Sequence, residues 1–211
     1  MFIKVCGITD ENQAKEIANY GATHIGVVYF PHSKRHVNFE KIKSIKKVIP
    51  QNTKLTVVVV NPKKEEIHKL FEVADVIQFH GDEDIEFLKS FPKEKIIKAF
   101  RLKDGKSIEK IKPFLDEGFQ ILIDAYSNKE YGGTGKQIEE KIIEKVKVLT
   151  DNFILSGGLS ENNVYDLIKK YKPFGVDASS KLEVRPGIKD LDKVYKFIKN
   201  SKKAFEELNI E

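Results

Sequence analysis

The stretch "FGVDASS" at residues 174–180 decides the predicted fold, because it is the eighth run of its kind in the chain. Each run is short, mostly apolar and nearly continuous, which is typical of strands that are covered on both faces. The earlier runs are "FIKVCGI" (2–8), "HIGVVYF" (24–30), "KLTVVVV" (54–60), "VIQFH" (76–80), "KIIKAF" (95–100), "FQILIDA" (119–125) and "FILSGG" (153–158).

Charged segments with helical spacing lie between these runs. In "NFEKIKSIKKVIP" we expect Asn38 to be the N-cap, and in "KSIEKIKPFLDEG" we expect a kink or a break at Pro113. Ser160 is the expected N-cap of "SENNVYDLIKKY", and residues 190–208 have the pattern of one long amphipathic helix.

This alternation of strands and helices predicts an α/β protein with a parallel sheet. An open sheet usually has fewer strands, so the eighth run favours closure into a (β/α)8 TIM barrel. No low-complexity linker interrupts the chain, and we expect a single domain over residues 1–211.

Composition limits the partners. The chain has 211 residues, a net charge of +5 and a pI of about 9.0, and basic proteins commonly bind nucleic acid or anionic metabolites. The lysines, however, are spread among Ile, Val and Glu at helical spacing. This pattern favours solvated helix faces, so we expect no nucleic-acid partner.

The sequence also predicts a cytoplasmic location. No apolar run approaches the roughly 20 residues of a membrane helix, and the start "MFIKVCGITD" lacks the apolar stretch of a signal peptide. A single cysteine, Cys6, cannot form an intramolecular disulfide, which fits a reducing compartment. We expect no membrane partner.

In a TIM barrel the chemistry lies at the C-terminal ends of the strands. Side chains alternate along each strand, and the polar members of several strands share one face, which we expect to point into the barrel. The pairs on these faces are Lys4 with Cys6, Gln78 with His80, Leu122 with Asp124, and Asp177 with Ser179.

Asp124 ends an apolar run at the start of "IDAYSNKEYGGTGK" (123–136). A carboxylate there costs free energy unless it is paired, hydrated or used. Cys6 by itself is more often inert core packing, but the ammonium of Lys4 would lower its pKa. The loop "YGGTGKQ" lacks P-loop spacing, and a lid that moves on its glycines is the better interpretation.

Two loops predict a phosphate site. Gly157 and Gly158 in "ILSGGL" permit close backbone approach, and Ser179 and Ser180 in "GVDASS" can open a short helix whose N–H groups attract an anion. Ordinary turn chemistry is the alternative reading of both loops.

Two further motifs carry weaker signals. "HGDED" has no partner with metal-ligand spacing elsewhere, so we expect no metal, and Asp82 is expected to cap the next helix. Arg35 in "HSKRHV" has the planar donor group that suits a carboxylate, although a lone arginine is more often a surface residue.

Taken together, six segments closely resemble one family, phosphoribosylanthranilate isomerase. They follow the family's order from residue 4 to 190 and are "KVCGIT", "SKR", "QFHGDE", "IDAYSNKEYGGTGK", "LSGGLSENNV" and "VDASSKLEVRPGIKD". Each segment alone is weak evidence, but the combination is specific.

The resemblance implies an Amadori rearrangement of N-(5-phosphoribosyl)anthranilate, with no metal or organic cofactor. It assigns Asp124 as general acid, Cys6 as general base and Arg35 as the partner of the anthranilate carboxylate. It places the phosphate at Gly157, Gly158, Ser179 and Ser180, and it makes Gln78, His80 and Asp177 candidate substrate-binding residues. An ordinary aspartate is mostly ionised at pH 7, so the acid role predicts a raised pKa for Asp124. We expect a monomer or a homodimer.

The sequence departs from the family pattern at Lys181, where many relatives have glycine. Lys181 either adds charge near the phosphate or alters the start of the short helix. Rival readings are another phosphosugar barrel enzyme, such as a ribulose-phosphate epimerase or a histidine-pathway isomerase with paired aspartates, and a non-catalytic basic binding protein. Cys6 at the position of the base argues against the histidine-pathway enzyme.

Overall fold

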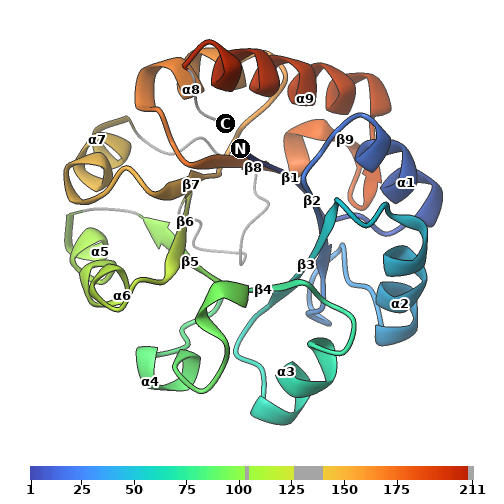
Figure 1. Ribbon diagram of the computed structural model, residues 1–211, viewed down its shortest axis with the longest axis horizontal. Coiled ribbons are helices and arrows are strands. Elements are labelled where there is room, and N and C mark those ends of the chain that lie inside the picture. The colour runs from blue at the N-terminus through green and yellow to red at the C-terminus, as the bar shows by residue number, and fades with distance from the viewer. Residues whose placement is uncertain (103–104, 126–139, 209–211) are drawn as a thin grey trace.

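The computed structural model describes residues 1–102, 105–125 and 140–208. Its centre is a closed barrel of eight parallel strands, in which β1 pairs with both β2 and β8 (Figure 1). The strands are β1 (Phe2–Cys6), β2 (His24–Val28), β3 (Lys54–Val59), β4 (Val76–Phe79), β5 (Ile96–Leu102), β6 (Gln120–Ala125), β7 (Phe153–Leu155) and β8 (Gly175–Ala178). Every predicted run overlaps one strand, so the predicted TIM barrel is confirmed.

Helices form a ring around the barrel (Figure 1). They are α1 (Glu11–Asn19), α2 (Phe39–Val48), α3 (Lys64–Leu70), α4 (Ile85–Leu88), α5 (Gly105–Glu109), α6 (Lys112–Asp116), α7 (Glu140–Leu149), α8 (Val164–Tyr171) and α9 (Leu191–Glu206), with short 3-10 turns η1 (Lys93–Lys95) and η2 (Ser180–Leu182). Asn38 caps α2 by accepting from the N–H of Lys41 at 2.9 Å, as predicted. The predicted break at Pro113 is also confirmed, because α5 and α6 are separate helices.

The predicted cap at Ser160 is wrong. The helix α8 begins after Asn163, and residues 161–163 form turns. The N–H of Ser160 donates to the Asn163 side chain at 2.8 Å, and the Ser160 hydroxyl accepts from the N–H of Asn162 at 3.3 Å. Ser160 therefore stabilises a turn of its own, and the helix starts only after that turn is complete.

The predicted cap at Asp82 is wrong as well. The N-cap of α4 is Asp84, whose Oδ1 accepts from the N–H of Phe87 at 2.7 Å. The carboxylate of Asp82 instead lies 3.2 Å from Nη2 of Arg101 on β5. In a run of three acidic residues, the last one before the apolar helix face takes the cap.

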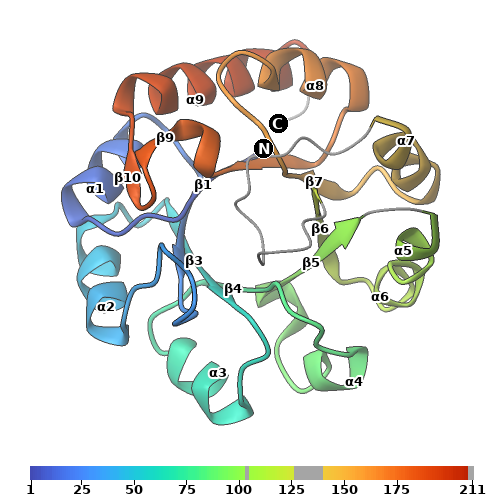
Figure 2. The same cartoon turned by 180° about the vertical axis from the view of Figure 1, so that it is seen from behind.

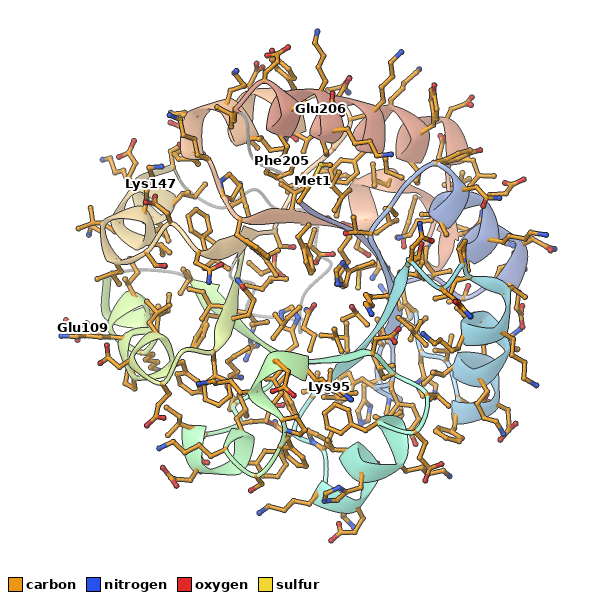
Figure 3. The ribbon with its side chains drawn as sticks, in the orientation of Figure 1. Met1, Lys95, Glu109, Lys147, Phe205 and Glu206 are labelled. Carbon is orange, nitrogen blue, oxygen red and sulfur yellow. The ribbon has the colours of Figure 1, made fainter. Side chains whose placement is uncertain are left out.

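Alternation along the strands divides the core into two layers. The outer layer lies between barrel and helices and includes Ile3 and Val5, both fully buried. Phe205 points inward from α9 into this layer, whereas Glu206 lies on the outer side (Figure 3). Inside the barrel a separate apolar cluster, here named the barrel floor, consists of Phe2, Ile97, Ala99, Leu122 and Ile154. The predicted assignment of strand faces is thus confirmed.

An antiparallel hairpin follows β8 and was not predicted. It consists of β9 (Glu183–Arg185) and β10 (Ile188–Lys189), and it lies beside β1 between α1 and α9 (Figure 2). The hydroxyl of Thr9 donates to the Gly187 carbonyl at 2.7 Å, and the side chain of Gln13 accepts from the N–H of Lys189 at 3.0 Å. These bonds fix the hairpin next to the end of β1.

Candidate active site

A cavity lies at the C-terminal ends of the barrel strands, where enzymes with this fold carry their active sites. The structure brings all ten predicted site residues to its wall. They are Cys6, Arg35, Gln78, His80, Asp124, Gly157, Gly158, Asp177, Ser179 and Ser180. Their shared location follows from the closed barrel, whereas their chemical roles remain predictions.

Cys6 ends β1 and lines the cavity, with only 8% of the residue exposed. Its carbonyl accepts from the Ser179 hydroxyl at 2.9 Å, which ties β1 to the loop after β8. Burial raises the pKa of the thiol, the charge of Lys4 lowers it, and the charge of Asp177 raises it. The net direction is upward, so the predicted effect of Lys4 is present but smaller than the cost of desolvating a thiolate.

A buried ion pair lies inside the barrel below the thiol, toward the start of β1. Lys4 Nζ is 2.9 Å from Asp177 Oδ1, and the Ser156 hydroxyl donates to Asp177 Oδ2 at 3.2 Å. Burial lowers the pKa of Lys4, but the negative charges of Asp177 and a Cys6 thiolate raise it above its ordinary value. Lys4 therefore keeps its positive charge at neutral pH.

Asp124 lies on β6 with 6% of the residue exposed, and its Oδ2 is 3.5 Å from His80 Nε2. Burial lowers the pKa of His80 to about 3, and the charges of Lys4 and Lys98 act in the same direction. The ring is therefore neutral at pH 7. The amide nitrogen of Gln78 lies 3.3 Å from His80 Nδ1, and this contact is a hydrogen bond in the tautomer that carries its proton on Nε2, the nitrogen nearer Asp124.

The two predicted phosphate loops lie side by side on the cavity wall. Gly157 and Gly158 have φ angles of 87° and 72°, which favour glycine. Ser180 begins the short turn η2, and Lys181 follows it on the same wall. Among the described non-glycine residues only Asn61 and Lys172 have a positive φ, so Lys181 enters the turn without backbone strain.

Another part of the wall, formed by β2, β3 and the loops after them, is apolar and holds Val28, Phe30, Val58 and Val60. Arg35 lies in the loop after β2. Its guanidinium forms a two-bond pair with Glu183, with Nε 2.8 Å from Oε1 and Nη2 2.7 Å from Oε2.

Sequence reasoning missed several parts of this site. Ser156, which binds Asp177, lies within "ILSGGL" but does not stand out there, and the apolar wall carries no motif, because serine and valine occur throughout strands and loops. Glu183 and Lys189 were missed because they belong to the unpredicted hairpin. The one available signal was the Pro-Gly pair at residues 186–187, which indicates a tight turn directly after the eighth strand.

The residues of "HGDED" serve different neighbours. Glu83 Oε2 lies 2.7 Å from Lys98 Nζ, and Glu83 Oε1 accepts from the N–H of Asn61 at 2.8 Å. Within the described ranges, no group of three or more His, Cys, Asp or Glu side chains is placed to hold a metal ion. None of the helices in those ranges has the length and apolar character of a bilayer-spanning segment.

Comparison with known proteins decides the family. A family model described as N-(5'phosphoribosyl)anthranilate (PRA) isomerase matches residues 3–200. The chain belongs to the PRA isomerase family. A PRA isomerase from Sulfurihydrogenibium sp. (strain YO3AOP1) is 52% identical over 198 residues, which cover 94% of this chain and 97% of that relative. The resemblance found from the motifs is thereby confirmed.

Solved PRA isomerase structures agree with this assignment. One, in complex with reduced 1-(o-carboxyphenylamino)-1-deoxyribulose 5-phosphate, has a TM-score of 0.83 and 30% identity, covering 96% of this chain and 99% of that one. Another, of monomers derived from the dimeric PRA isomerase of Thermotoga maritima, has a TM-score of 0.85 at 30% identity with the same coverage. This PRA isomerase is therefore an enzyme of tryptophan biosynthesis that converts an aldose into a ketose.

Proposed function

We propose that this PRA isomerase rearranges its substrate with Asp124 as general acid and Cys6 as general base, without a metal or an organic cofactor. The observation that supports these roles is that both side chains line one cavity, from strands on different sides of the barrel. A carboxyl group and a thiol in one site can reach different atoms of a single sugar.

The proposed chemistry moves protons in three steps. Asp124 protonates the ribose ring oxygen, the bond from that oxygen to C1 breaks, and the nitrogen lone pair forms a positively charged C1=N Schiff base. Cys6 then removes the proton on C2, and the electron pair forms a C1=C2 bond as nitrogen regains its lone pair. The hydroxyl on C2 finally loses its proton and C1 gains one, which leaves the ketone.

A neighbouring group can stabilise the charged form of each of the two catalytic side chains. When Asp124 has given up its proton, the N–H on His80 Nε2 can stabilise the carboxylate. A free thiol is only about 3% thiolate at pH 7, and burial makes the thiolate of Cys6 still less stable. The positive Schiff base beside it offsets this cost at the moment when the base is needed.

We place the substrate by matching its three chemical parts to three parts of the wall. The phosphate lies at the loops of Gly157, Gly158, Ser179 and Ser180. The aromatic ring lies against the apolar wall, with its carboxylate toward Arg35. The ribose then lies between them, next to Cys6 and Asp124. The ligand in the solved relative contains the same three chemical parts, which supports this division of the substrate.

The test is the loss of anthranilate fluorescence on turnover, which is easily followed because the chain has no tryptophan. We expect Asp124→Asn and Cys6→Ser to reduce kcat by at least about a hundredfold, the usual contribution of a general acid or base. Glu140→Ala, at an exposed surface pair with Lys170, is the control. Wild-type kcat/KM in both active-site variants would refute the assignment.

One observation favours testing a second substrate. Asp177 shares the cavity with Asp124, so the site holds two aspartates, as a histidine-pathway isomerase would. Asp177, however, is bound by Lys4 and Ser156 and is therefore poorly placed to act as a base. We expect no turnover of the histidine-pathway aminoaldose, and measurable turnover that disappears in Asp177→Asn would assign that second activity.

We further propose a monomer or a homodimer as the assembled enzyme. The relative from Thermotoga maritima is described as dimeric, which supports testing for a dimer. Sedimentation equilibrium over a hundredfold range of protein concentration distinguishes the two states, and any larger assembly would contradict the proposal.

A further inference from the structure

An ionic cluster beside the cavity contains Arg35, Glu183 and Lys189. The carboxylate of Glu183 accepts from Arg35 through both oxygens, and Lys189 Nζ lies 2.8 Å from Glu183 Oε1. The side chains of Glu183 and Lys189 are buried, with exposures of 4% and 0%, and that of Arg35 is mostly covered, at 11%. Two basic side chains therefore surround one carboxylate at the edge of the cavity.

Such a cluster is not needed for stability alone. Removing charges from water is costly, and a buried ion pair often contributes no more than well-packed apolar residues would. Burial raises the pKa of Glu183, but the hydrogen bond from Arg35 and the charge of Lys189 outweigh it and lower the pKa. Glu183 is thus an ionised, fixed acceptor, which suits the task of orienting a guanidinium.

The cluster is joined to the reacting end of β1. Lys189 Nζ lies 3.2 Å from the Ser179 carbonyl oxygen, and Ser179 in turn binds the carbonyl of Cys6. The stem of Arg35 crosses the backbone just after Cys6, where a Cβ on Gly7 would approach Arg35 Cδ to 2.5 Å. Contacts on both sides therefore restrict the position of Arg35.

We propose that Glu183 is a positioning residue for Arg35, which it holds by one edge so that the guanidinium meets the carboxylate of the aromatic substrate in a single orientation. This inference rests on the role of Arg35 given under the proposed function. A guanidinium has five N–H donors in a rigid plane, and Glu183 engages the edge formed by Nε and Nη2. Fixing that edge determines the direction of the rest of the plane.

The test compares two ligands that differ only in the carboxylate. One is reduced 1-(2-carboxyphenylamino)-1-deoxyribulose 5-phosphate, and the other is the same compound made with aniline in place of anthranilate. Affinities are measured by calorimetry for wild type, Glu183→Ala, Arg35→Ala and the double variant. We expect Glu183→Ala to weaken binding of the carboxylate ligand about tenfold and to leave the aniline ligand within twofold.

The double variant separates positioning from general support. If Glu183 acts through Arg35, then adding Glu183→Ala to Arg35→Ala changes neither affinity further. The proposal would be overturned if Glu183→Ala lowered the affinity for both ligands equally. It would also be overturned if the double variant bound the carboxylate ligand more weakly than Arg35→Ala does. Steady-state kinetics should show the same pattern, with a raised KM and a kcat within about threefold of wild type.

Two controls keep the result decisive. Glu183→Gln has the same size and keeps one acceptor oxygen, so it replaces Glu183→Ala if that variant does not fold. We expect it to reduce the affinity for the carboxylate ligand by an intermediate amount. Glu140→Ala removes another glutamate–lysine pair, whose residues do not line the cavity, and should change neither affinity. If Arg35→Ala weakens binding of the two ligands equally, the proposed role of Arg35 and this inference both fail. The assignment of the protein as an isomerase does not depend on that result.

Discussion

At the scale of single residues, opposing effects act on the sulfur of Cys6. Burial disfavours the thiolate, while the charge of Lys4 favours it. In Lys4→Met we expect the pKa of the thiol to rise further, so that iodoacetamide alkylates Cys6 severalfold more slowly at pH 8.

Lys4→Met also leaves the carboxylate of Asp177 without its cation, which itself affects the thiol. The effect of Lys4 alone is therefore measured by comparing Asp177→Asn with the double variant Lys4→Met/Asp177→Asn. In this pair only the ammonium changes. Equal alkylation rates would show that the charge of Lys4 does not influence the thiol.

His80 is predicted to stay neutral over the working range of the enzyme. Its pKa is lowered to about 3 by burial and by nearby cations, so the ring should not take up a proton between pH 8 and pH 5. Proton NMR should show one histidine Cε1–H resonance, assigned by its loss in His80→Asn, that does not shift across this range. A midpoint between pH 6 and pH 7 would contradict the burial argument.

The residues of the cavity were largely predictable because two simple rules place them. The ends of parallel strands meet at one mouth, and alternation decides which side chains enter it; together these rules bring Cys6, His80 and Asp124 to one wall. Neither rule locates Glu183, because its place depends on a hairpin that folds back from β8 toward β1. Nor do these rules show that burial raises the pKa of the Cys6 thiol more than the charge of Lys4 lowers it, because the extent of burial is known only from the three-dimensional structure.

At the scale of elements, the turn η2 carries a testable departure from the family pattern. Lys181 has an unstrained backbone and lies on the cavity wall, which favours the reading that it adds charge near the phosphate. We expect Lys181→Gly to raise KM severalfold with kcat nearly unchanged, and to reduce the dependence of KM on salt concentration. An unchanged KM at low salt would instead favour a purely structural lysine.

The strands were easier to predict than the helix starts. A buried parallel strand is marked by a continuous apolar run, and this signal identified every strand of the barrel. The runs extended past the strands at their C-terminal ends, as in β7, where "FILSGG" continues into the loop beyond Leu155. Helix starts depend on which of several polar residues bonds which part of the backbone. Asp84 caps α4 in place of Asp82. At α8 the side chain of Asn163 binds the preceding turn at Ser160 and Gly158, so the helix begins only after Asn163.

At the scale of the whole molecule, histidines with lowered pKa values make stability depend on pH. His24 stacks on Phe2 with ring centroids 4.0 Å apart, and burial lowers its pKa from 6.5 to about 3. As pH falls below about 6.5, the unfolded chain binds a proton that the folded chain does not. The contribution of His24 is therefore complete above pH 6.5 and is lost progressively between pH 6.5 and pH 3.

The variant His24→Phe should remove this dependence while keeping the ring contact. Between pH 7 and pH 5 we expect the unfolding free energy of the wild type to fall by about 2 kcal/mol more than that of the variant. Urea unfolding at the two pH values measures the difference. Parallel losses in both proteins would mean that His24 is protonated in the folded state.

The barrel floor has a consequence for how the enzyme exchanges molecules with its surroundings. Phe2, Ile97, Ala99, Leu122 and Ile154 close the lower end of the barrel with hydrocarbon, so the reaction chamber is a well rather than a tunnel. Arriving aminoaldose and departing ketose must share the upper opening, one after the other. Substrate entry and product release through that opening, rather than the chemical steps, can then limit the rate of each catalytic cycle.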